Sequence, residues 1–234
     1  MSVEIPISEI FGPTIQGEGF HAGVPTVFVR TGGCDYRCQW CDTLYAVLPE
    51  FKKDWIKHTP EQIMEKVEEL SKEPILITFS GGNPALHDLK PVIDLAHSKG
   101  YTTTMETQGS VPQMWFNDLT HLIISPKPPS SQMKTDWLKL NDCINSVQDP
   151  NKISLKVVVN DISDYNYALE VFDRYPFIKN RFITPCNTSP GDPDFDAIYE
   201  KARFVVDTVL KDKRYDITIL PQLHVLLYGN ERGK

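Results

Sequence analysis

The chain has 234 residues, enough for one large domain with a hydrophobic core. Hydrophobic residues make up 41% and charged residues 24%, as in ordinary globular proteins, and the net charge of -7 disfavours a nucleic-acid partner. No apolar run reaches the roughly 20 residues of a membrane-spanning helix, and the first residues show no signal-peptide pattern, so we expect a cytoplasmic protein that does not enter a membrane.

Strand-like and helix-like segments alternate along the chain. Apolar or β-branched runs predict strands at residues 25–30, 75–80, 101–106, 121–125, 153–159, 181–184 and 215–220. The first predicted helix has Thr59 as its N-cap, Pro60 at its first position and Gln62 closing a capping box. A second covers residues 86–99 and ends at Gly100, and a third covers residues 195–210.

This alternation predicts a parallel sheet with right-handed crossovers. Six or seven strands fit an incomplete barrel better than a closed barrel of eight. We therefore expect an α/β fold, an incomplete TIM-like barrel of about six parallel strands with outer helices, formed by residues 1–234 as a single domain. In such folds the chemistry lies on loops at the C-terminal strand ends, which here read GGCDYRCQWC, GGNP, TQGS, PKPP and PCNTSPG.

The five cysteines are too few, and odd in number, for a disulfide framework. Cys34, Cys38 and Cys41 follow the first predicted strand, close enough for three thiolates to bind one metal group from a single loop. A cubane cluster usually takes four cysteines, so three would leave one iron open to the amino and carboxylate groups of S-adenosylmethionine (SAM). Electron transfer into the sulfonium would then release a 5′-deoxyadenosyl radical, so we predict a [4Fe–4S] cluster on these three residues.

Two other interpretations of the cysteines stay open at this point. A structural zinc site would use His21 or His58 as fourth ligand, but zinc loops usually have a second, distant Cys-x2-Cys pair, which the sequence lacks. An iron–sulfur carrier protein would need a fourth cysteine in a ferredoxin spacing. Cys143 and Cys186 are isolated, and we interpret them as ordinary thiols.

The spacing Cys-x3-Cys-x-aromatic-Cys resembles the radical SAM superfamily, with Trp40 at the aromatic position. The signature Gly-Gly-Glu-Pro of that superfamily has its counterpart in Gly81-Gly82-Asn83-Pro84. The resemblance implies a barrel of the radical SAM type, with Trp40 near the adenine of SAM and Gly82 near its amino group. The presence of Asn in place of Glu is a mild departure from the signature, because the backbone makes the contact with the amino group of SAM.

Further motifs narrow the family. The segments EIFGPTIQGEG, SPKPPSS and PQLH together resemble the 7-carboxy-7-deazaguanine synthase family of queuosine biosynthesis, in its Gram-positive type, over residues 9–233. The resemblance implies a carbon–nitrogen lyase that converts 6-carboxy-5,6,7,8-tetrahydropterin to 7-carboxy-7-deazaguanine with loss of ammonia. It also implies a Mg²⁺ ion, flavodoxin or ferredoxin as electron donor, and a homodimer.

The resemblance assigns residues by position. It implies that the pterin substrate contacts Ile15, Gln16, Gly17, Arg30, Ser80 and Gly229. It implies that SAM contacts Trp40, Gly82, Ser125, Pro126 and Lys127. Thr43 is the implied Mg²⁺ ligand, against the alternative that it is a helix N-cap or a turn residue.

Several residues keep two interpretations. Glu18 is either a ligand of the pterin edge or part of a surface turn, and His224 is either structural or part of the site. Lys156 either reaches a surface or points into the barrel. Residues 184–187 match a SAM-binding stretch only loosely. A competing function, a glycyl-radical-enzyme activase, is disfavoured by IQGEG and SPKPP.

Overall fold

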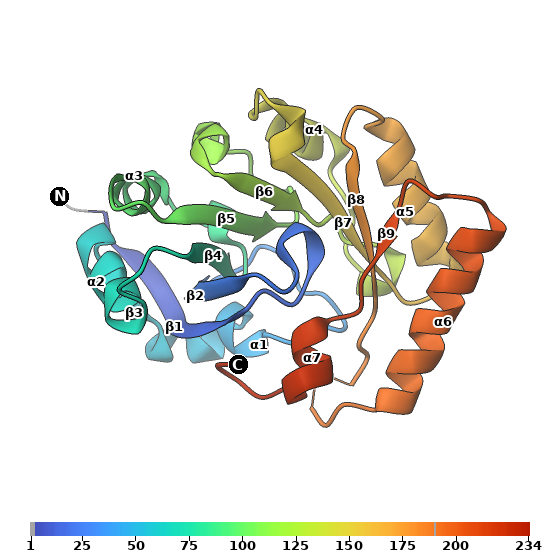
Figure 1. Cartoon of the computed structure of the whole chain (residues 1–234), viewed down its shortest axis with the longest axis horizontal. Coiled ribbons are helices and arrows are strands. Elements are labelled where there is room, and N and C mark those ends of the chain that lie inside the picture. The colour runs from blue at the N-terminus through green and yellow to red at the C-terminus, as the bar shows by residue number, and fades with distance from the viewer. Residues whose placement is uncertain (1–2, 190) are drawn as a thin grey trace.

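The structure is a computed structural model that describes residues 3–189 and 191–234. In that part of the chain nine strands form one sheet in the order β3-β1-β2-β4-β5-β6-β7-β8-β9. The sheet curves from β3 to β9 without closing on itself, with helices on its outside (Figure 1). This arrangement confirms the predicted incomplete barrel.

Seven neighbouring strands run parallel, six of them four to seven residues long and the last of two residues. These strands are β2 (Pro25–Thr31), β4 (Leu76–Gly81), β5 (Thr102–Thr107), β6 (His121–Ile124), β7 (Ile153–Val159), β8 (Asn180–Pro185) and β9 (Thr218–Ile219). The strand predicted at residues 215–220 is thus wrong in its length. Tyr215 is 75% exposed and Asp216 is paired with Arg214 at the surface, so the chain is still in a turn there.

The N-terminal strand was not predicted. β1 (Ile5–Ile15) runs antiparallel to β2, and β3 (Ile56–His58) runs antiparallel to β1 on its other side. The pairing of β1 with β2 is irregular between Phe11 and Thr14, and buried and exposed residues do not alternate cleanly along β1. The alternation of apolar and polar residues that indicates a strand is therefore not visible in the sequence of β1. Ile15 lies opposite Pro25, which places the end of β1 at the N-terminal ends of the parallel strands.

Seven helices occur in the described residues. They are α1 (Leu44–Val47), α2 (Pro60–Leu70), α3 (Lys90–Ser98), α4 (Trp137–Asn145), α5 (Ile162–Arg174), α6 (Phe195–Lys211) and α7 (Leu223–Tyr228). The capping box of α2 is confirmed, because Thr59 N donates to Gln62 Oε1 (2.9 Å) and Gln62 N donates to Thr59 Oγ1 (3.4 Å). The second predicted helix starts four residues late, at Lys90, because residues 84–86 form a separate 3-10 turn.

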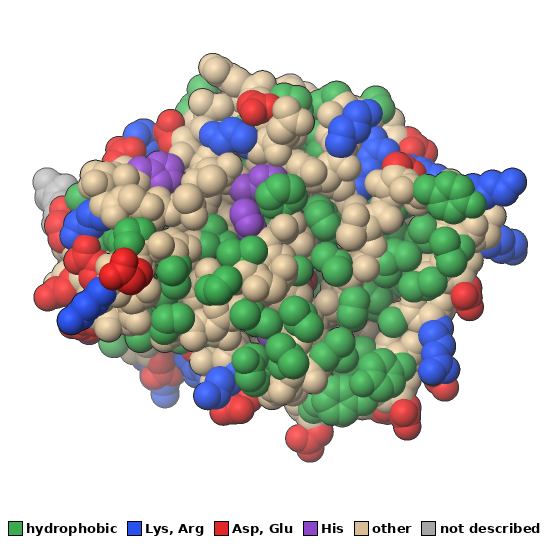
Figure 2. Space-filling model, viewed as in Figure 1, with side chains coloured by type: hydrophobic (Ala, Val, Ile, Leu, Met, Phe, Trp, Pro, Cys, Tyr) green, Lys and Arg blue, Asp and Glu red, His purple; other side chains and the backbone are tan. Residues whose placement is uncertain are grey.

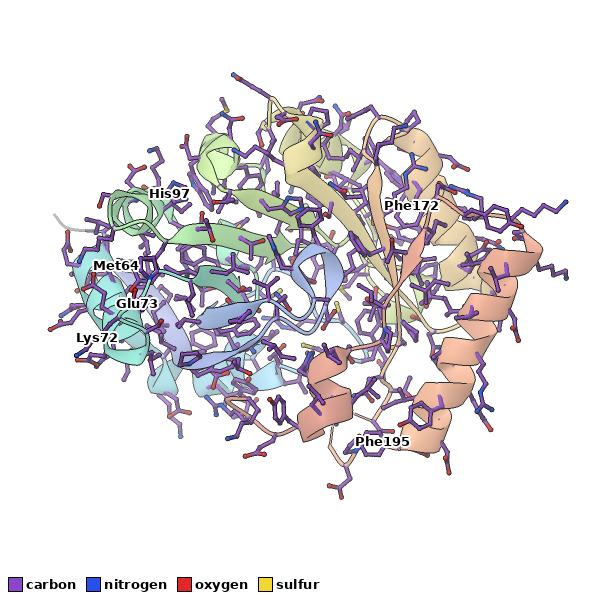
Figure 3. All side chains as sticks on the ribbon, viewed as in Figure 1. Met64, Lys72, Glu73, His97, Phe172 and Phe195 are labelled. Carbon is purple, nitrogen blue, oxygen red and sulfur yellow. The ribbon has the colours of Figure 1, made fainter. Side chains whose placement is uncertain are left out.

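The core lies between the sheet and the outer helices. Figure 3 shows Met64 on α2 and Phe172 on α5, at opposite ends of the sheet, and both are buried. Burying such side chains stabilises the fold by roughly 1.5–3 kcal/mol each. None of the helices in the described residues is both long and apolar enough to cross a membrane.

The inside of the barrel is covered at its N-terminal end by the loop that joins β1 to β2. This loop contains the short 3-10 helix η1 (Gly19–His21), which contacts β7 and β8. A Cβ atom on Gly19 would lie 3.6 Å from Ile123 and 3.8 Å from Lys156. The loop therefore forms a floor, and the C-terminal strand ends stay open for a site above it.

Candidate active site

One cavity gathers most of the predicted site residues. It is lined by side chains from β1, β2, β4, β5 and β7 and from the loops at the C-terminal strand ends. The predicted residues along its wall are Ile15, Gln16, Arg30, Cys34, Cys38, Trp40, Cys41, Thr43, Ser80, Gly82 and Lys127. The expectation that these loops converge on one mouth is confirmed.

The loop after β2 presents the three cysteines to this cavity. All three are free thiols and are partly buried. Burial raises the pKa of each thiol, that of Cys38 to about 11, while the nearby Lys127 ammonium works in the opposite direction. Thiols in this setting become thiolates when a bound metal group supplies positive charge.

The same loop is held in place from one side. Gln39 N donates to Ser131 O (3.0 Å), and Tyr36 Oη donates to Lys134 O (3.0 Å). Among the described residues, no three His, Cys, Asp or Glu side chains are arranged around a single ion position. His21 and His58 do not line the cavity, so neither stands ready as a fourth zinc ligand. Three thiols that face one cavity suit a cluster that binds its thiolates through different irons.

Trp40 is fixed by a chain of hydrogen bonds. Its Nε1 donates to Ser130 Oγ (2.9 Å), which donates to Asp164 Oδ2 (2.5 Å). Asp164 is fully buried and also accepts from Ser130 N (2.9 Å). The indole therefore keeps one orientation at the cavity wall, which suits a surface for a flat ring.

The glycines after β4 allow the chain to pass close to the cysteine loop. Gly81 has φ +143°, and a Cβ atom there would lie 2.2 Å from Thr31 O. A Cβ atom on Gly82 would lie 2.1 Å from Gly33 O. Both positions need glycine, and the turn they form leaves backbone groups next to the thiols. Three thiols beside such a turn fit a [4Fe–4S] cluster with SAM.

Four predicted site residues lie away from the cavity lining. Ser125 is fully buried and accepts a hydrogen bond from Lys127 Nζ (3.1 Å), and Pro126 lies between them in the chain. Gly17 accepts from Leu223 N (3.0 Å) at the start of α7. Gly229 ends α7 with φ +64°. Their assigned contacts stay predictions.

The upper wall carries a group of charges that we call the rim cluster: Glu9, Arg30, Tyr45 and Arg232. Arg30 Nε donates to Glu9 Oε1 (2.7 Å), and Arg30 Nη1 donates to Ser80 Oγ (3.4 Å). Tyr45 Oη donates to Glu9 Oε1 (2.7 Å), and Arg232 Nε donates to Glu9 Oε2 (2.9 Å). Burial alone would raise the pKa of Glu9, but Arg30, Tyr45 and Arg232 hold it below its usual range.

The bottom of the cavity carries a second group, the floor cluster: Glu18, Glu106, Lys156 and Gln222. Lys156 Nζ donates to Glu18 Oε2 (2.5 Å) and to Glu106 Oε2 (2.8 Å), and Gln222 Nε2 donates to Glu18 Oε1 (2.9 Å). Burial alone would raise the pKa of Glu18, but Lys156, His224 and Gln222 hold it at about 2. Burial alone would lower the pKa of Lys156, but Glu106 and Glu18 hold it above its usual range.

The structure narrows the interpretation of four residues. Lys156 is 2% exposed and points inward, so it does not reach a surface. Glu18 and His224 both line the cavity. Thr43 precedes α1, but its side chain makes no capping hydrogen bond and donates instead to Asp42 Oδ1 (3.0 Å). Thr43 thus stands at the N-cap position of α1, as the alternative interpretation expected, but its hydroxyl does not make the capping hydrogen bond.

Sequence reasoning gave no role to Glu9, Glu106 and Gln222, which lie at the site. Asn187, in the stretch 184–187 that resembles a SAM-binding segment loosely, lines the cavity. Glu106 ends an apolar and threonine-rich strand run, and a charge at that position was the available signal. Cys186, interpreted as an ordinary thiol, is buried as expected but also lines the cavity.

Comparison with known proteins agrees with this site. Residues 28–124 match the Radical SAM superfamily. The 7-carboxy-7-deazaguanine synthase of Bacillus subtilis is 40% identical to this chain over 100% of both chains, and that of Bacillus cereus is 40% identical over 98% of this chain and 99% of its own. The chain belongs to the 7-carboxy-7-deazaguanine synthase family.

The family also extends to more distant relatives. The 7-carboxy-7-deazaguanine synthase of Thermoplasma acidophilum is 31% identical over 97% of this chain and 99% of its own. The crystal structure of QueE from Escherichia coli has the same fold, with a TM-score of 0.69 over 94% of this chain and 95% of that chain at 23% identity. As a member of a radical SAM family, this 7-carboxy-7-deazaguanine synthase homologue is an enzyme, and membership implies a [4Fe–4S] cluster and SAM. Neither the activase nor the carrier protein is favoured.

Proposed function

We propose that this chain is a lyase of queuosine biosynthesis that converts 6-carboxy-5,6,7,8-tetrahydropterin to 7-carboxy-7-deazaguanine and ammonia. The observation that carries the proposal is the 40% identity to the Bacillus subtilis synthase over both full lengths. The atoms balance as substrate to product plus one ammonia, so no net oxidant is needed and SAM can be regenerated. Residues 1–234 act in this proposal as a single radical SAM domain.

In the proposal Cys34, Cys38 and Cys41 hold the [4Fe–4S] cluster, which together with SAM supplies the radical that abstracts hydrogen from C6 of the substrate. Trp40 lies where an adenine can stack on its fixed indole. Gly82 offers backbone groups to the amino end of SAM, and Ser125, Pro126 and Lys127 bind it from the loop after β6.

The rim cluster prepares the site for the substrate carboxylate. Arg30 is held through Nε by Glu9, and its terminal nitrogens lie on the side of Ser80 and the cavity. A guanidinium fixed in this way can bind a carboxylate through two parallel hydrogen bonds. Ile15, Gln16 and Gly17 are assigned to the pterin ring, and Gly229 to a contact from the C-terminal segment.

The floor cluster suits the polar edge of the pterin. Glu18 carries a negative charge at neutral pH because its pKa is about 2, so it can accept hydrogen bonds from ring N–H and amino groups. Lys156 neutralises it from below, and Gln222 fixes its orientation. The floor therefore presents acceptors to the ligand without leaving a buried charge unpaired.

Thr43 is proposed as the protein ligand of Mg²⁺, which also binds the substrate carboxylate. Magnesium keeps waters and substrate oxygens and needs few protein ligands, and Asp42 lies beside the hydroxyl. We expect Thr43→Ala to weaken the dependence of activity on Mg²⁺ and to lower kcat at least about tenfold, the rate cost of roughly 1.4 kcal/mol. Iron content should stay that of wild type, and unchanged activity would remove Thr43 from the site.

A homodimer and a flavodoxin or ferredoxin electron donor complete the proposal. Hydrophobic side chains gather over α6 and α7 on the face shown in Figure 2. Exposed apolar residues of these helices include Phe195, Tyr199, Phe204, Leu227 and Tyr228. Patches of this kind support an interface between proteins, and the mass of the protein in solution tests the dimer.

The deciding experiment is a substrate assay. Anaerobically purified protein should be brown, with about four irons per chain. With SAM, Mg²⁺ and a chemical reductant, it should convert the carboxytetrahydropterin to a product with deazaguanine absorption and release one ammonia per product. The triple variant Cys34→Ala, Cys38→Ala, Cys41→Ala is the matched control and should be colourless and inactive. A loaded wild-type enzyme that does not turn over this pterin would overturn the proposal.

A further inference from the structure

Asn83 stands where the radical SAM signature has glutamate, and its surroundings account for the exchange. The residue is fully buried, and its amide uses all of its hydrogen-bonding groups. Nδ2 donates to Asp35 Oδ1 (2.9 Å) and to Ser110 Oγ (3.2 Å). Oδ1 accepts from Thr107 Oγ1 (2.8 Å) and from Ala85 N (3.2 Å). An amide with every group paired in a buried place is highly specified.

Asp35 is the point at which three loops meet. It follows Cys34 directly, and its Oδ1 accepts both from Asn83 and from Gln108 Nε2 (2.7 Å) in the loop after β5. The Gln108 amide also reaches Cys34 Sγ (3.7 Å), and Asn83 N donates to Gly33 O (2.8 Å). Side chain and backbone of Asn83 therefore both tie the glycine turn to the cysteine loop.

A carboxylate at position 83 would conflict with Asp35. Replacing Nδ2 of Asn83 by an oxygen would remove the donor to Asp35 and set two carboxylate oxygens about 2.9 Å apart, one on the fully buried residue 83 and one on the exposed Asp35. Like charges at this separation disfavour each other strongly, and the group loses its donors as well. A carboxylate in the place of the Asn83 amide thus conflicts with aspartate at position 35, and the longer glutamate could not put its oxygens on the partners of that amide.

The opposite arrangement, with the amide at position 35 and the carboxylate at position 83, can pair the same hydrogen-bonding groups. With asparagine at position 35 and aspartate at position 83, the new amide would donate to the new carboxylate. The new amide nitrogen would take the place of Asp35 Oδ1, so Gln108 would turn its own amide to present Oε1 as the acceptor, and the Ser110 hydroxyl would turn to donate to position 83. The two sites therefore tolerate at most one carboxylate and need an amide donor at the other position.

We propose that Asp35 and Asn83 are a matched pair of positioning residues that sets the distance between Cys34 and the Gly81–Gly82 turn. Neither residue of the pair lines the cavity. The pair acts through the placement of the first cluster thiol against the turn proposed to bind SAM, and it rests on that part of the proposed function. The asparagine in GGNP is set by the aspartate that follows Cys34.

A double-mutant cycle on the reconstituted full chain tests the pair. The variants are Asn83→Asp, Asp35→Asn and the exchange of both, with Asn166→Asp on the exposed side of α5 as the matched control. The readouts are iron content, the Kd for SAM, and the change that SAM causes in the EPR spectrum of the reduced cluster. We expect Asn83→Asp to weaken SAM binding at least about tenfold and to reduce the SAM-induced spectral change, and Asp35→Asn to cost less, because it keeps an acceptor toward Gln108.

The decisive result is rescue. The double variant should bind SAM within about threefold of wild type, which is far better than the sum of the two single effects predicts. If the losses of SAM affinity in the two single variants simply add in the double variant, the proposed coupling of Asp35 and Asn83 is wrong. A double variant that fails to fold would also contradict it. If Asn83→Asp alone fails to fold while the double variant folds and binds SAM, the coupling is still established. If wild type itself shows no SAM-induced spectral change, the proposed function fails rather than the pair.

Discussion

The rim cluster and the floor cluster use the same chemistry at opposite ends of one cavity, with different burial. Lys156 at the floor is 2% exposed, and its two glutamates are 15% and 27% exposed. At the rim, Arg232 is 56% exposed, while Arg30 and Glu9 are 15% and 13% exposed. Removing one partner of a buried ion pair destabilises the fold strongly, whereas an exposed ion pair can break at little cost in free energy. The floor is therefore a fixed part of the fold, whereas at the rim the exposed partner, Arg232, can leave Glu9 when a carboxylate ligand binds.

The largest expected effect is at the floor. Lys156→Met would leave Glu18 and Glu106 without their shared cation, and removing one partner of a buried ion pair costs about 3–5 kcal/mol. We expect urea unfolding to show a loss of that size, together with loss of activity in the substrate assay. Lys139→Met on the exposed side of α4 is the control and should change stability by less than about 0.5 kcal/mol. Equal behaviour of the two variants would show that the floor is not a fixed unit.

The second largest expected effect is at Arg30, the guanidinium of the rim cluster that lines the cavity. Arg30→Gln removes the fixed donor pair proposed to bind the substrate carboxylate, and a hydrogen bond to a charged group contributes about 1.5–3 kcal/mol. We expect the Kd for the carboxypterin to rise about 10- to 100-fold, while the Kd for the tetrahydropterin that lacks the carboxylate stays within about twofold of wild type. Arg30→Lys should recover only part of the affinity, since an ammonium cannot form the fork. A loss of equal size for both ligands would assign Arg30 to the pterin ring instead.

These two clusters also mark the limit of sequence reasoning. The cysteine loop, the glycine turn and the capping box of α2 could be predicted, because each signal lies within a few neighbouring residues. The floor pair Lys156–Glu18 joins residues 138 apart, and the rim pair Arg232–Glu9 joins residues 223 apart. Such pairs depend on how β1 and the C-terminal segment fold back over the barrel. Because β1 was not predicted as a strand, Glu9 could not be placed beside Arg30.

A third test compares how the contributions of the floor cluster and the rim cluster to stability depend on pH. Glu18 has a pKa of about 2 in the folded protein and an ordinary value of 4.5, so its ionised form contributes stability above pH 4.5. That contribution is lost as the pH falls from 4.5 toward 2. We expect Glu18→Gln to cost about 1–3 kcal/mol at neutral pH, and the difference from wild type to shrink through this window. Urea unfolding at a series of pH values measures it. The same series for Glu9→Gln should show a shallower change, because Arg232 is exposed; equal slopes would contradict the difference in burial.

The smallest expected effect on stability is that of Arg232, the most exposed residue of the rim cluster. Arg232 Nε lies 2.9 Å from Glu9 Oε2, and its guanidinium lies 4.0 Å from the centroid of the Tyr45 ring. Exposed ion pairs and exposed cation–π contacts each contribute less than about 1 kcal/mol, and salt screens the ion pair. We expect Arg232→Ala to lower the unfolding free energy by less than about 1 kcal/mol, with a smaller loss at high salt, and Arg232→Lys to recover most of it. If Arg232→Ala instead weakened carboxypterin binding as much as Arg30→Gln, the rim would be one interdependent unit like the floor. Arg232 would then hold Glu9, and through Glu9 the guanidinium of Arg30, in place for the ligand.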